Sequence, residues 1–276
     1  MATPVLLTAV LFAFGIYFLS PVLWLLFAST KTTAELFNTF GLWFGHHFSL
    51  GSQLNALFAE DGHIYLRWLG NTVVYSLLGA GAATVLAAAC GYALAKYQFR
   101  GRELTFSVVL GGVLVPGTAL AIPLYLIMSK IGLTDTYWAV LLPSVVSPFG
   151  VYLSRVYATA AVPDELIQAA RIDGAGEFRT FATIGMPLMS PALVTVFLFQ
   201  FVAIWNNFLL PLVMLSDERL YPVTLGLFTW NSQVTHYPQY FGLTVIGSVV
   251  SVLPLAVAFM MLQRFWRADL AAGSVK

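Results

Sequence analysis

The stretch PDELIQAARIDGAGEFRTFATIGMPLMSP, residues 163–191, is a polar and charged interruption between two strongly apolar regions. Pro163 suits the first turn of a helix, where a missing N–H costs nothing. Asp164 and Glu165 then place negative charge at the positive end of that helix. Gly174 suits a turn, because glycine adopts positive φ freely. The pattern predicts a short helix that ends at a glycine turn.

A second short helix is predicted over residues 176–184, and Pro187 and Pro191 are expected to end it and redirect the chain. Apolar residues recur at helical spacing in both helices: Leu166 and Ala170 in the first, then Phe178, Phe181 and Ile184 in the second. Such a segment suits either a membrane surface or a groove on a protein. A surface helix favours a basic polar face, whereas this segment has four acids and two arginines, which favours docking on a protein.

The composition indicates a membrane protein. Of the 276 residues, 59% are hydrophobic and 9% are charged, against about 25% charged in a typical soluble domain. A soluble protein of this size could not bury that much apolar surface, but a multi-span protein can, because lipid is its solvent. The first apolar stretch is too long for a cleavable signal peptide and lacks a basic start, so we expect a retained span.

Six spans are predicted from apolar runs about long enough to cross a bilayer. They cover residues 5–27, 69–95, 104–128, 137–157, 192–215 and 240–262. Pro116 and Pro123 interrupt the third, and the fourth contains Pro143 and Pro148. The expected fold is a single all-α polytopic membrane domain over residues 1–276. Its helix-turn-helix segment, residues 163–191, lies between spans four and five.

The basic residues orient these spans, because six spans put both termini on one side. Nine of the 13 basic residues fall on that side: Lys96, Arg100, Arg102, Arg155, Arg171, Arg179, Arg264, Arg267 and Lys276. The other four are Lys31, Arg67, Lys130 and Arg219. By the positive-inside rule, both termini and residues 163–191 are expected in the cytoplasm. The loops at 29–67 and 216–239 then face outward.

The predicted spans lack the groups that self-powered transport needs. No Asp, Glu, Lys or His lies well inside a predicted span, which disfavours an ion-coupled transporter. No glycine-rich phosphate loop followed by Lys-Ser or Lys-Thr occurs, so the chain is not expected to hydrolyse ATP in that way, and the energy for any uphill transport must come from another subunit. No nucleophile elbow and no metal-ligand spacing is visible, which disfavours an enzyme and a metal site. A passive channel or facilitator is the alternative to an energy-coupled permease.

Polar and aromatic side chains inside the predicted spans are candidates for lining a solute pathway. They are Asn71, Tyr125, Gln200, Trp205, Asn206 and Asn207. An unpaired amide in hydrocarbon is costly, so these amides are expected to face protein or water. Amides that donate and accept, beside aromatic rings, suit recognition of sugar hydroxyls. Hydrogen bonding between helices would explain the same residues.

Residues 163–191 resemble the EAA loop of permease subunits from bacterial ABC importers, and we call them the EAA-like segment. The family's spacing is matched by Gln168, Ala169, Ala170, Gly174, Ile184, Met186 and Pro187. The surrounding ELIQAARIDGA resembles the form found in carbohydrate importers of the maltose-permease type. Similar pieces run through the chain: FASTKTTAELF (27–37), GYALAKYQFRGRE (91–103), a proline pattern at 116–125, GLTDTYWA (132–139), WNNFLLPL (205–212) and LAAGSVK (270–276). The tail resembles that of the second permease in a two-permease importer.

The resemblance implies a non-catalytic transport subunit of the bacterial plasma membrane, surrounded by lipid, that binds no cofactor and no nucleic acid. Two permeases would form the pathway, two cytoplasmic ATPases would bind ATP and Mg and drive it, and an extracytoplasmic binding protein would deliver a sugar or sugar-like solute. The implied ATPase-coupling residues are Glu165, Gln168, Ala169, Ala170, Asp173, Gly174, Ala175, Phe178, Phe181, Ile184 and Pro187.

The chain departs from the family pattern at three positions. Gln168 stands where the motif has Glu, Met186 where it has Leu, and Asp269 where a Gly is usual in the tail. Gln168 keeps the length and the hydrogen bonding of Glu without its charge. Docking is therefore expected to depend on shape, on Gly174 and on the stripe of Phe178 and Phe181.

Overall fold

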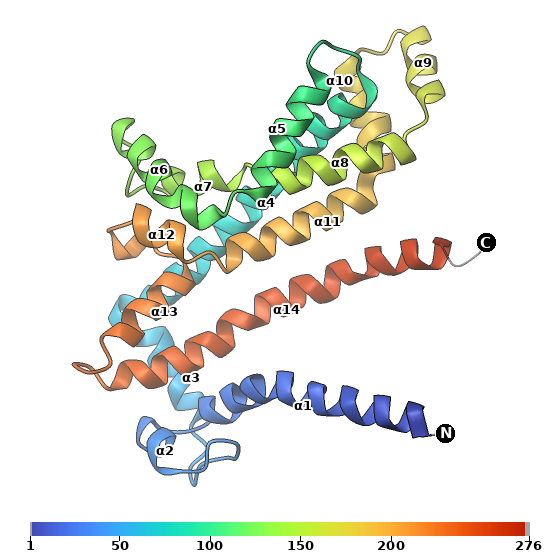
Figure 1. Cartoon of the computed structure of the whole chain (residues 1–276). Coiled ribbons are helices and arrows are strands. Elements are labelled where there is room, and N and C mark those ends of the chain that lie inside the picture. Colours follow the sequence, from blue (N-terminus) through green and yellow to red (C-terminus); the bar gives the residue numbers. More distant parts are fainter. Residues whose placement is uncertain (1, 274–276) are drawn as a thin grey trace. The chain divides into compact units, whose positions relative to one another are not determined.

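The computed structural model describes the backbone of residues 2–273 and the side chains of residues 7, 8 and 10–261. Every regular element in that range is a helix, which confirms the predicted all-α fold (Figure 1). The side chains of the tail motif at 270–276, of Asp269, and of Arg264, Arg267 and Lys276 lie outside the described residues. The chain divides into two compact units: residues 1–69 with 225–254, and residues 70–224 with 255–276.

The first unit is held together by aromatic side chains. Trp68 and Trp230 pack with their ring centroids 4.7 Å apart, and the Tyr65 hydroxyl donates to the carbonyl of Gly247 over 2.7 Å. A Cβ on Gly226 would lie 2.2 Å from the Trp68 ring, so this close approach requires glycine. The elements are α1 (Ala2–Ser29), α2 (Thr33–Asn38), α3 (Leu50–Ala59), η1 (Glu60–Gly62), the start of α4 (Ile64–Lys96), most of α13 (Val223–Ser232) and the first part of α14 (Gln239–Gly273).

The second unit packs helices closely through small residues. A Cβ on Gly91 would lie 2.5 Å from the Ser154 Cβ, so α4 and α8 approach backbone to backbone. Besides the rest of α4, the unit contains α5 (Arg102–Leu114), α6 (Gly117–Lys130), α7 (Tyr137–Ser144), α8 (Pro148–Ala161), α9 (Asp164–Ile172), α10 (Glu177–Thr180), the π-helical turn η2 (Phe181–Gly185), α11 (Met186–Trp205), α12 (Leu209–Met214) and η3 (Glu218–Leu220).

Five helical segments are long and apolar enough to cross a membrane: Val10–Ser29, Ile64–Lys96, Tyr137–Ala161, Glu177–Trp205 and Gln239–Met261. A sixth candidate is the pair of α5 and α6, which are bent by 105° at the break between them. The span predicted over 104–128 is therefore not one straight helix. Pro116 has no N–H to donate, and it favours the extended conformation that Val115 adopts, with φ −81° and ψ 118°.

The helix in the region of the span predicted over 192–215 has different bounds from that range at both ends. The helical segment begins at Glu177, continues through Pro187 and Pro191, and ends at Trp205. The π-helical turn η2 explains how it continues, since the N–H of Met186 donates to the carbonyl of Phe181, five residues back. Pro187 then occupies the start of α11, where a missing N–H is tolerated. The prediction that the two prolines end the helix is thus corrected.

Candidate functional site

The EAA-like segment begins with the predicted helix and glycine turn. Helix α9 ends at Ile172, and Gly174 has φ 77°, the left-handed conformation expected of it. The N–H of Ala175 donates to the carbonyl of Ala170 over 2.9 Å and closes the helix end. The turn at Gly174 is confirmed, and it reverses the chain from α9 into α10.

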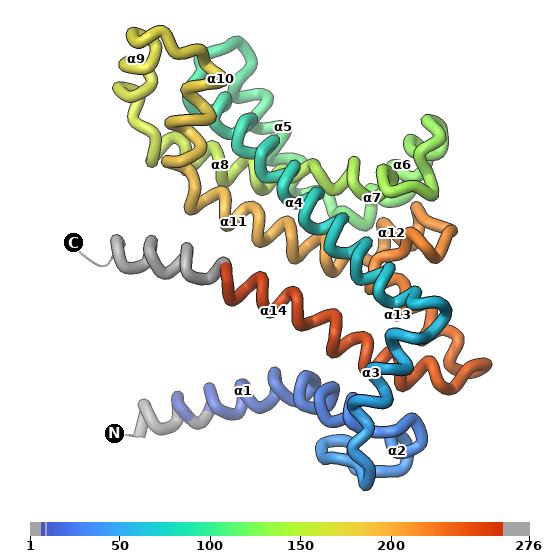
Figure 2. Tube along the Cα trace, turned by 180° about the vertical axis from the view of Figure 1, so that it is seen from behind, coloured from blue at the N-terminus to red at the C-terminus, as the bar shows by residue number. Residues whose placement is uncertain are grey.

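Polar contacts tie the EAA-like segment to the C-terminal end of α4. The Lys96 ammonium donates to Asp164 over 2.8 Å, with the Lys96 side chain 6% exposed. The Glu177 carboxylate accepts the Tyr97 hydroxyl over 2.7 Å and the Arg171 Nε–H over 2.8 Å. Both views of the chain show α9 and α10 beside the connection between α4 and α5 (Figures 1 and 2). Sequence reasoning missed Tyr97, although it lies in the family-like piece at 91–103.

An apolar cluster also anchors the EAA-like segment to α4. Ile167 and Phe181 pack in a core around Tyr92 of α4, and the Phe181 ring centroid lies 5.2 Å from that of Tyr92. A Cβ on Gly185 would lie 2.8 Å from the Tyr92 ring, so glycine lets the π-helical turn rest on it. Phe178, Phe181 and Ile184 therefore do not form one exposed stripe, because Phe181 is buried in the unit while Phe178 is exposed.

The outward face of the segment differs from the predicted one. Phe178 is 82% exposed and Ile172 is 87% exposed, whereas Ala170, predicted to share a face with Leu166, is buried. Helix α9 instead buries Ile167 with Ala170. The outward residues among those predicted are Glu165, Gln168, Ala169, Asp173, Gly174, Phe178 and Pro187, while Ala175 and Ile184 are half-buried. Ile172 was missed, although an isoleucine just before a glycine turn is a signal of an apolar group left at a helix end.

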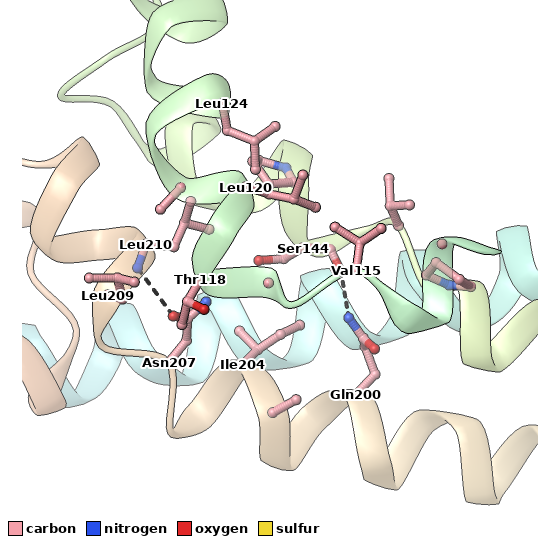
Figure 3. A pocket seen from close by; sticks show the side chains of 17 residues that line it. Val115, Thr118, Leu120, Leu124, Ser144, Gln200, Ile204, Asn207, Leu209 and Leu210 are labelled. Carbon is pink, nitrogen blue, oxygen red and sulfur yellow. Dashed lines mark hydrogen bonds between the residues drawn. The ribbon is translucent and has the colours of Figure 1, made fainter. Parts of the chain in front are cut away.

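A cavity of about 590 Å³ lies where three helix breaks of the second unit meet (Figure 3). The break between α5 and α6 contributes Val115, Gly117 and Thr118; the break between α7 and α8 contributes Ser144, Val146 and Pro148; and the break between α11 and α12 contributes Asn207, Leu209 and Leu210. Breaks in helices leave backbone groups without intrahelical partners, and in membranes they are tolerated where they line a cavity or are buried in protein.

Two of the predicted pathway residues line this cavity. Gln200 donates through Nε2 to the carbonyl of Ser144 over 2.9 Å, which ties α11 to the end of α7. Asn207 accepts the N–H of Leu210 over 3.3 Å and so caps the first turn of α12. Figure 3 shows both amides at the cavity wall, with Thr118 beside Asn207.

The other predicted pathway residues lie elsewhere. Asn71 is buried and fully engaged between helices, donating to the carbonyls of Arg219 and Tyr221 and accepting the Tyr137 hydroxyl. Trp205 is buried beside Phe201, with ring centroids 5.5 Å apart. Tyr125 is 38% exposed and is not part of the cavity lining, and the Asn206 amide donates back to Val202 of its own helix. Hydrogen bonding within and between helices explains Asn71 and Asn206.

Comparisons with known proteins identify relatives of this chain. Residues 83–268 match the family model of binding-protein-dependent transport system inner membrane components. The arabinooligosaccharides transport system permease protein AraQ of Halalkalibacterium halodurans is 37% identical over 257 residues, which are 93% of this chain and 90% of that protein. The lactose transport system permease protein LacG of Rhizobium radiobacter is 31% identical over 259 residues, with 93% and 90% covered.

The fold has a counterpart among solved structures. A chain in the crystal structure of a bacterial ABC transporter that imports the acidic polysaccharide alginate superposes with a TM-score of 0.82 at 21% identity, covering 95% of this chain and 96% of that one. The family model covers most of the chain, and both relatives exceed 30% identity over nearly all of it. The chain therefore belongs to the inner membrane components of binding-protein-dependent transport systems, as a multi-pass, non-catalytic permease subunit of an ABC importer that works with a solute-binding protein.

Proposed function

We propose that this permease moves a neutral sugar or sugar-like solute across the bacterial plasma membrane as one half of the translocation pathway. The solute class is inferred from the lining of the cavity between the helix breaks. This lining combines two amides and two hydroxyls with apolar groups and contains no charged residue. Amides and hydroxyls match sugar hydroxyls, and apolar walls match the C–H faces of a sugar ring. Relatives named for arabinooligosaccharide and lactose transport support this class.

The topology is proposed as six spans with both termini in the cytoplasm. Basic residues near the EAA-like segment support this topology by the positive-inside rule. Lys96 pairs with Asp164 of the segment, Arg171 pairs with Glu177 within the segment, and Arg155 pairs with Glu103 at the start of α5. In this orientation the EAA-like segment faces the cytoplasm. There it would meet an ATPase subunit, while the loops at 29–67 and 216–239 would lie on the opposite side of the membrane, the side on which the solute-binding protein docks.

The outward face of the EAA-like segment is the proposed docking surface for the ATPase. Phe178, Ile172 and Leu166 expose apolar groups there, and Gln168 and Ala169 lie on the exposed part of α9. A compact apolar surface of this kind suits a groove on a protein partner. A second permease, two ATPases and the ATP and Mg bound by those ATPases complete the proposed importer.

Contacts within the second unit connect the proposed docking surface to the cavity, so a movement of the ATPase could reach the solute pathway. The EAA-like segment is anchored to α4 by Lys96 and Tyr97, and it continues without a break into α11. Helix α11 carries Gln200 to the cavity wall. A displacement of the docking surface would therefore move α11 as a rigid element and alter the cavity, which is the two-state behaviour that coupled transport needs.

The solute class is tested with the assembled importer in proteoliposomes, supplied with its own solute-binding protein and internal ATP. Neutral oligosaccharides of arabinose and galactose-containing disaccharides are compared with oligogalacturonate, an acidic sugar polymer. Uptake and stimulated ATP hydrolysis are expected with a neutral sugar. Uptake confined to the acidic polymer would contradict the proposed class.

A further inference from the structure

Residues 30–49 form a closed loop at the end of α1 in the first unit, around the short helix α2 (Figures 1 and 2). The N–H of Ser49 donates to the carbonyl of Thr30 over 2.7 Å, so the two ends of the loop are joined directly. Gln53 of α3 adds a bond from its amide to the carbonyl of Lys31 over 2.9 Å. The loop therefore has a defined shape at its base.

The two charged side chains of this loop are used to hold its backbone. Lys31 is 1% exposed, and its ammonium donates to the carbonyl of Phe40 over 2.7 Å. The Glu35 carboxylate accepts the N–H groups of His46 over 2.9 Å and of His47 over 3.1 Å, and it closes a capping box with Thr32. Backbone hydrogen bonds, first from Thr32 and then from His47, lower the pKa of Glu35, so the carboxylate that braces the loop stays ionised.

The outer surface of the loop is aromatic. Five side chains are largely exposed, and we call them the aromatic collar: Phe37 (66%), Phe40 (74%), Trp43 (64%), Phe44 (49%) and Phe48 (71%). Residues 36–48 contain no Asp, Glu, Lys or Arg. A loop surrounded by water has the opposite arrangement, with charges outside and aromatic rings inside. The loop is built for an apolar environment.

Contacts with α1 place the collar beside the end of a candidate membrane span. The ring of Phe27 lies 4.8 Å from that of Phe44 and 6.0 Å from that of Trp43, centroid to centroid. A Cβ on Gly41 would lie 3.2 Å from the Trp24 Nε1, so the loop also folds back along the preceding turn. Trp24 and Phe27 belong to the span Val10–Ser29, whose most apolar part is not buried within the chain.

We propose that the aromatic collar inserts into the membrane–water interface and anchors the end of α1 in lipid. The tryptophan ring favours this region, where its apolar body meets lipid and its N–H meets water, and phenylalanine rings insert beside it into the acyl boundary. Continuity with the exposed face of a spanning helix favours lipid as the occupant. A soluble binding protein fits less well, because interfaces that form and dissociate in water have polar rims and charge complementarity, and residues 36–48 have no charged side chain.

Spin labels at the collar test this directly. Phe40→Cys and Phe48→Cys are each made in a Cys90→Ala background, which removes the one native cysteine. His236→Cys, at an exposed polar position between α13 and α14, is the matched control. The full-length chain, assembled with its co-expressed subunits in lipid nanodiscs, is measured by power saturation with oxygen and with a water-soluble nickel chelate. The collar labels are expected to favour oxygen, with nickel accessibility severalfold below that of the control.

Three results would overturn the proposal. Nickel accessibility at both collar positions equal to that of the control would place the collar in water. Immobilisation of the labels only when the loaded binding protein is added would make the collar a docking surface for that protein. Accessibility to neither reagent would place the partner permease over it. A measurement without spin labels covers the case in which the cysteine variants fail to assemble. Brominated lipids are expected to quench the tryptophan fluorescence of the native chain more than that of the Trp43→Phe variant.

Discussion

Gly174 has φ 77°, and an added Cβ would meet nothing within 4 Å, so any effect of a side chain there comes from the backbone alone. A side chain in the left-handed region costs about 1–2 kcal/mol, and a β-branched one is the least tolerated. Gly174→Val is therefore expected to shift the turn away from its native conformation by roughly 5- to 30-fold. Transport-linked ATP hydrolysis by the assembled importer should fall, with the amount of inserted chain unchanged.

Gly176→Val is the matched control for this change. An added Cβ at Gly176 also meets nothing within 4 Å, but its φ of −71° and ψ of 157° suit valine. Equal loss of coupled hydrolysis in both variants would contradict a role for the left-handed turn. Equal activity in both would show that the geometry of this turn does not limit coupling.

Gln200 and Asn206 are both polar residues in the C-terminal part of α11 or directly after it. Only Gln200 lines the cavity. Gln200→Leu removes the bond to the Ser144 carbonyl and an amide from the cavity wall, whereas the Asn206 amide donates back to its own helix. Losing one hydrogen bond between the cavity wall and the solute costs about 1 kcal/mol, or roughly fivefold in apparent affinity. The apparent KM for uptake is expected to rise in Gln200→Leu and to stay near the native value in Asn206→Leu. A larger effect at Asn206 would place the solute elsewhere.

At the residue scale, the sequence predicted backbone requirements better than burial. The conformation of Gly174 follows from local chemistry, since no other residue adopts it as easily. The burial of Phe181 depends on its contact with Tyr92, far away in the sequence, and Phe181 begins a π-helical turn. Local spacing contains neither fact, so it grouped Phe181 with the exposed Phe178.

At the element scale, Glu177 is one of the contacts that join α4 to the EAA-like segment, beside the Lys96–Asp164 pair, and it accepts bonds from both Tyr97 and Arg171. Tyr97→Phe removes the only one of these bonds that reaches from the end of α4, and it leaves the ring in place. We expect insertion and basal ATP hydrolysis to be retained, and the solute transported per ATP to fall, because the docking surface would move partly independently of α4. The ratio is measured from parallel uptake and phosphate-release assays.

Tyr152→Phe serves as the control for this prediction. Tyr152 belongs to the same unit and stacks on Phe106, and no hydrogen bond of its hydroxyl is found within the described residues. If Tyr97→Phe and Tyr152→Phe have the same transport per ATP as the native chain, the contact to Glu177 is a structural detail and not a route for the motion.

The elements themselves could be predicted only in part. Apolar runs located the long helices, and Pro116 was recognised as an interruption, but the 105° angle between α5 and α6 depends on how both pack against their neighbours. Pro187 and Pro191 were read as helix stops by a rule that holds for ordinary α-helices. The bond from Met186 to Phe181 lets the helix continue into Pro187 at the start of α11, and that bond has no signature in composition.

At the scale of the whole molecule, the described spans leave most of their apolar surface for other partners. Buried fractions of their most apolar windows are 44%, 44%, 33%, 22% and 0%, so none buries half of that window within the chain. Lipid, and the proposed second permease, would cover the remainder. The cavity between the helix breaks belongs to one unit, and a closed pathway would need a second wall.

Because the cavity has a wall from one chain only, transport by the chain alone distinguishes an importer subunit from a passive channel. The purified chain alone in liposomes is expected to take up no more sugar than protein-free liposomes, since one half of a pathway encloses no continuous pore. The full assembly with its binding protein should accumulate the sugar, and only with ATP inside the liposomes, because the described spans hold no Asp, Glu, Lys or His at their centres to couple uptake to an ion gradient. Radiolabelled uptake compares the two preparations, and Gly174→Val in the full assembly controls for leakage through assembled but uncoupled complexes. Sugar entry through the chain alone, without ATP, would make it a facilitator and would contradict its dependence on the partner subunits.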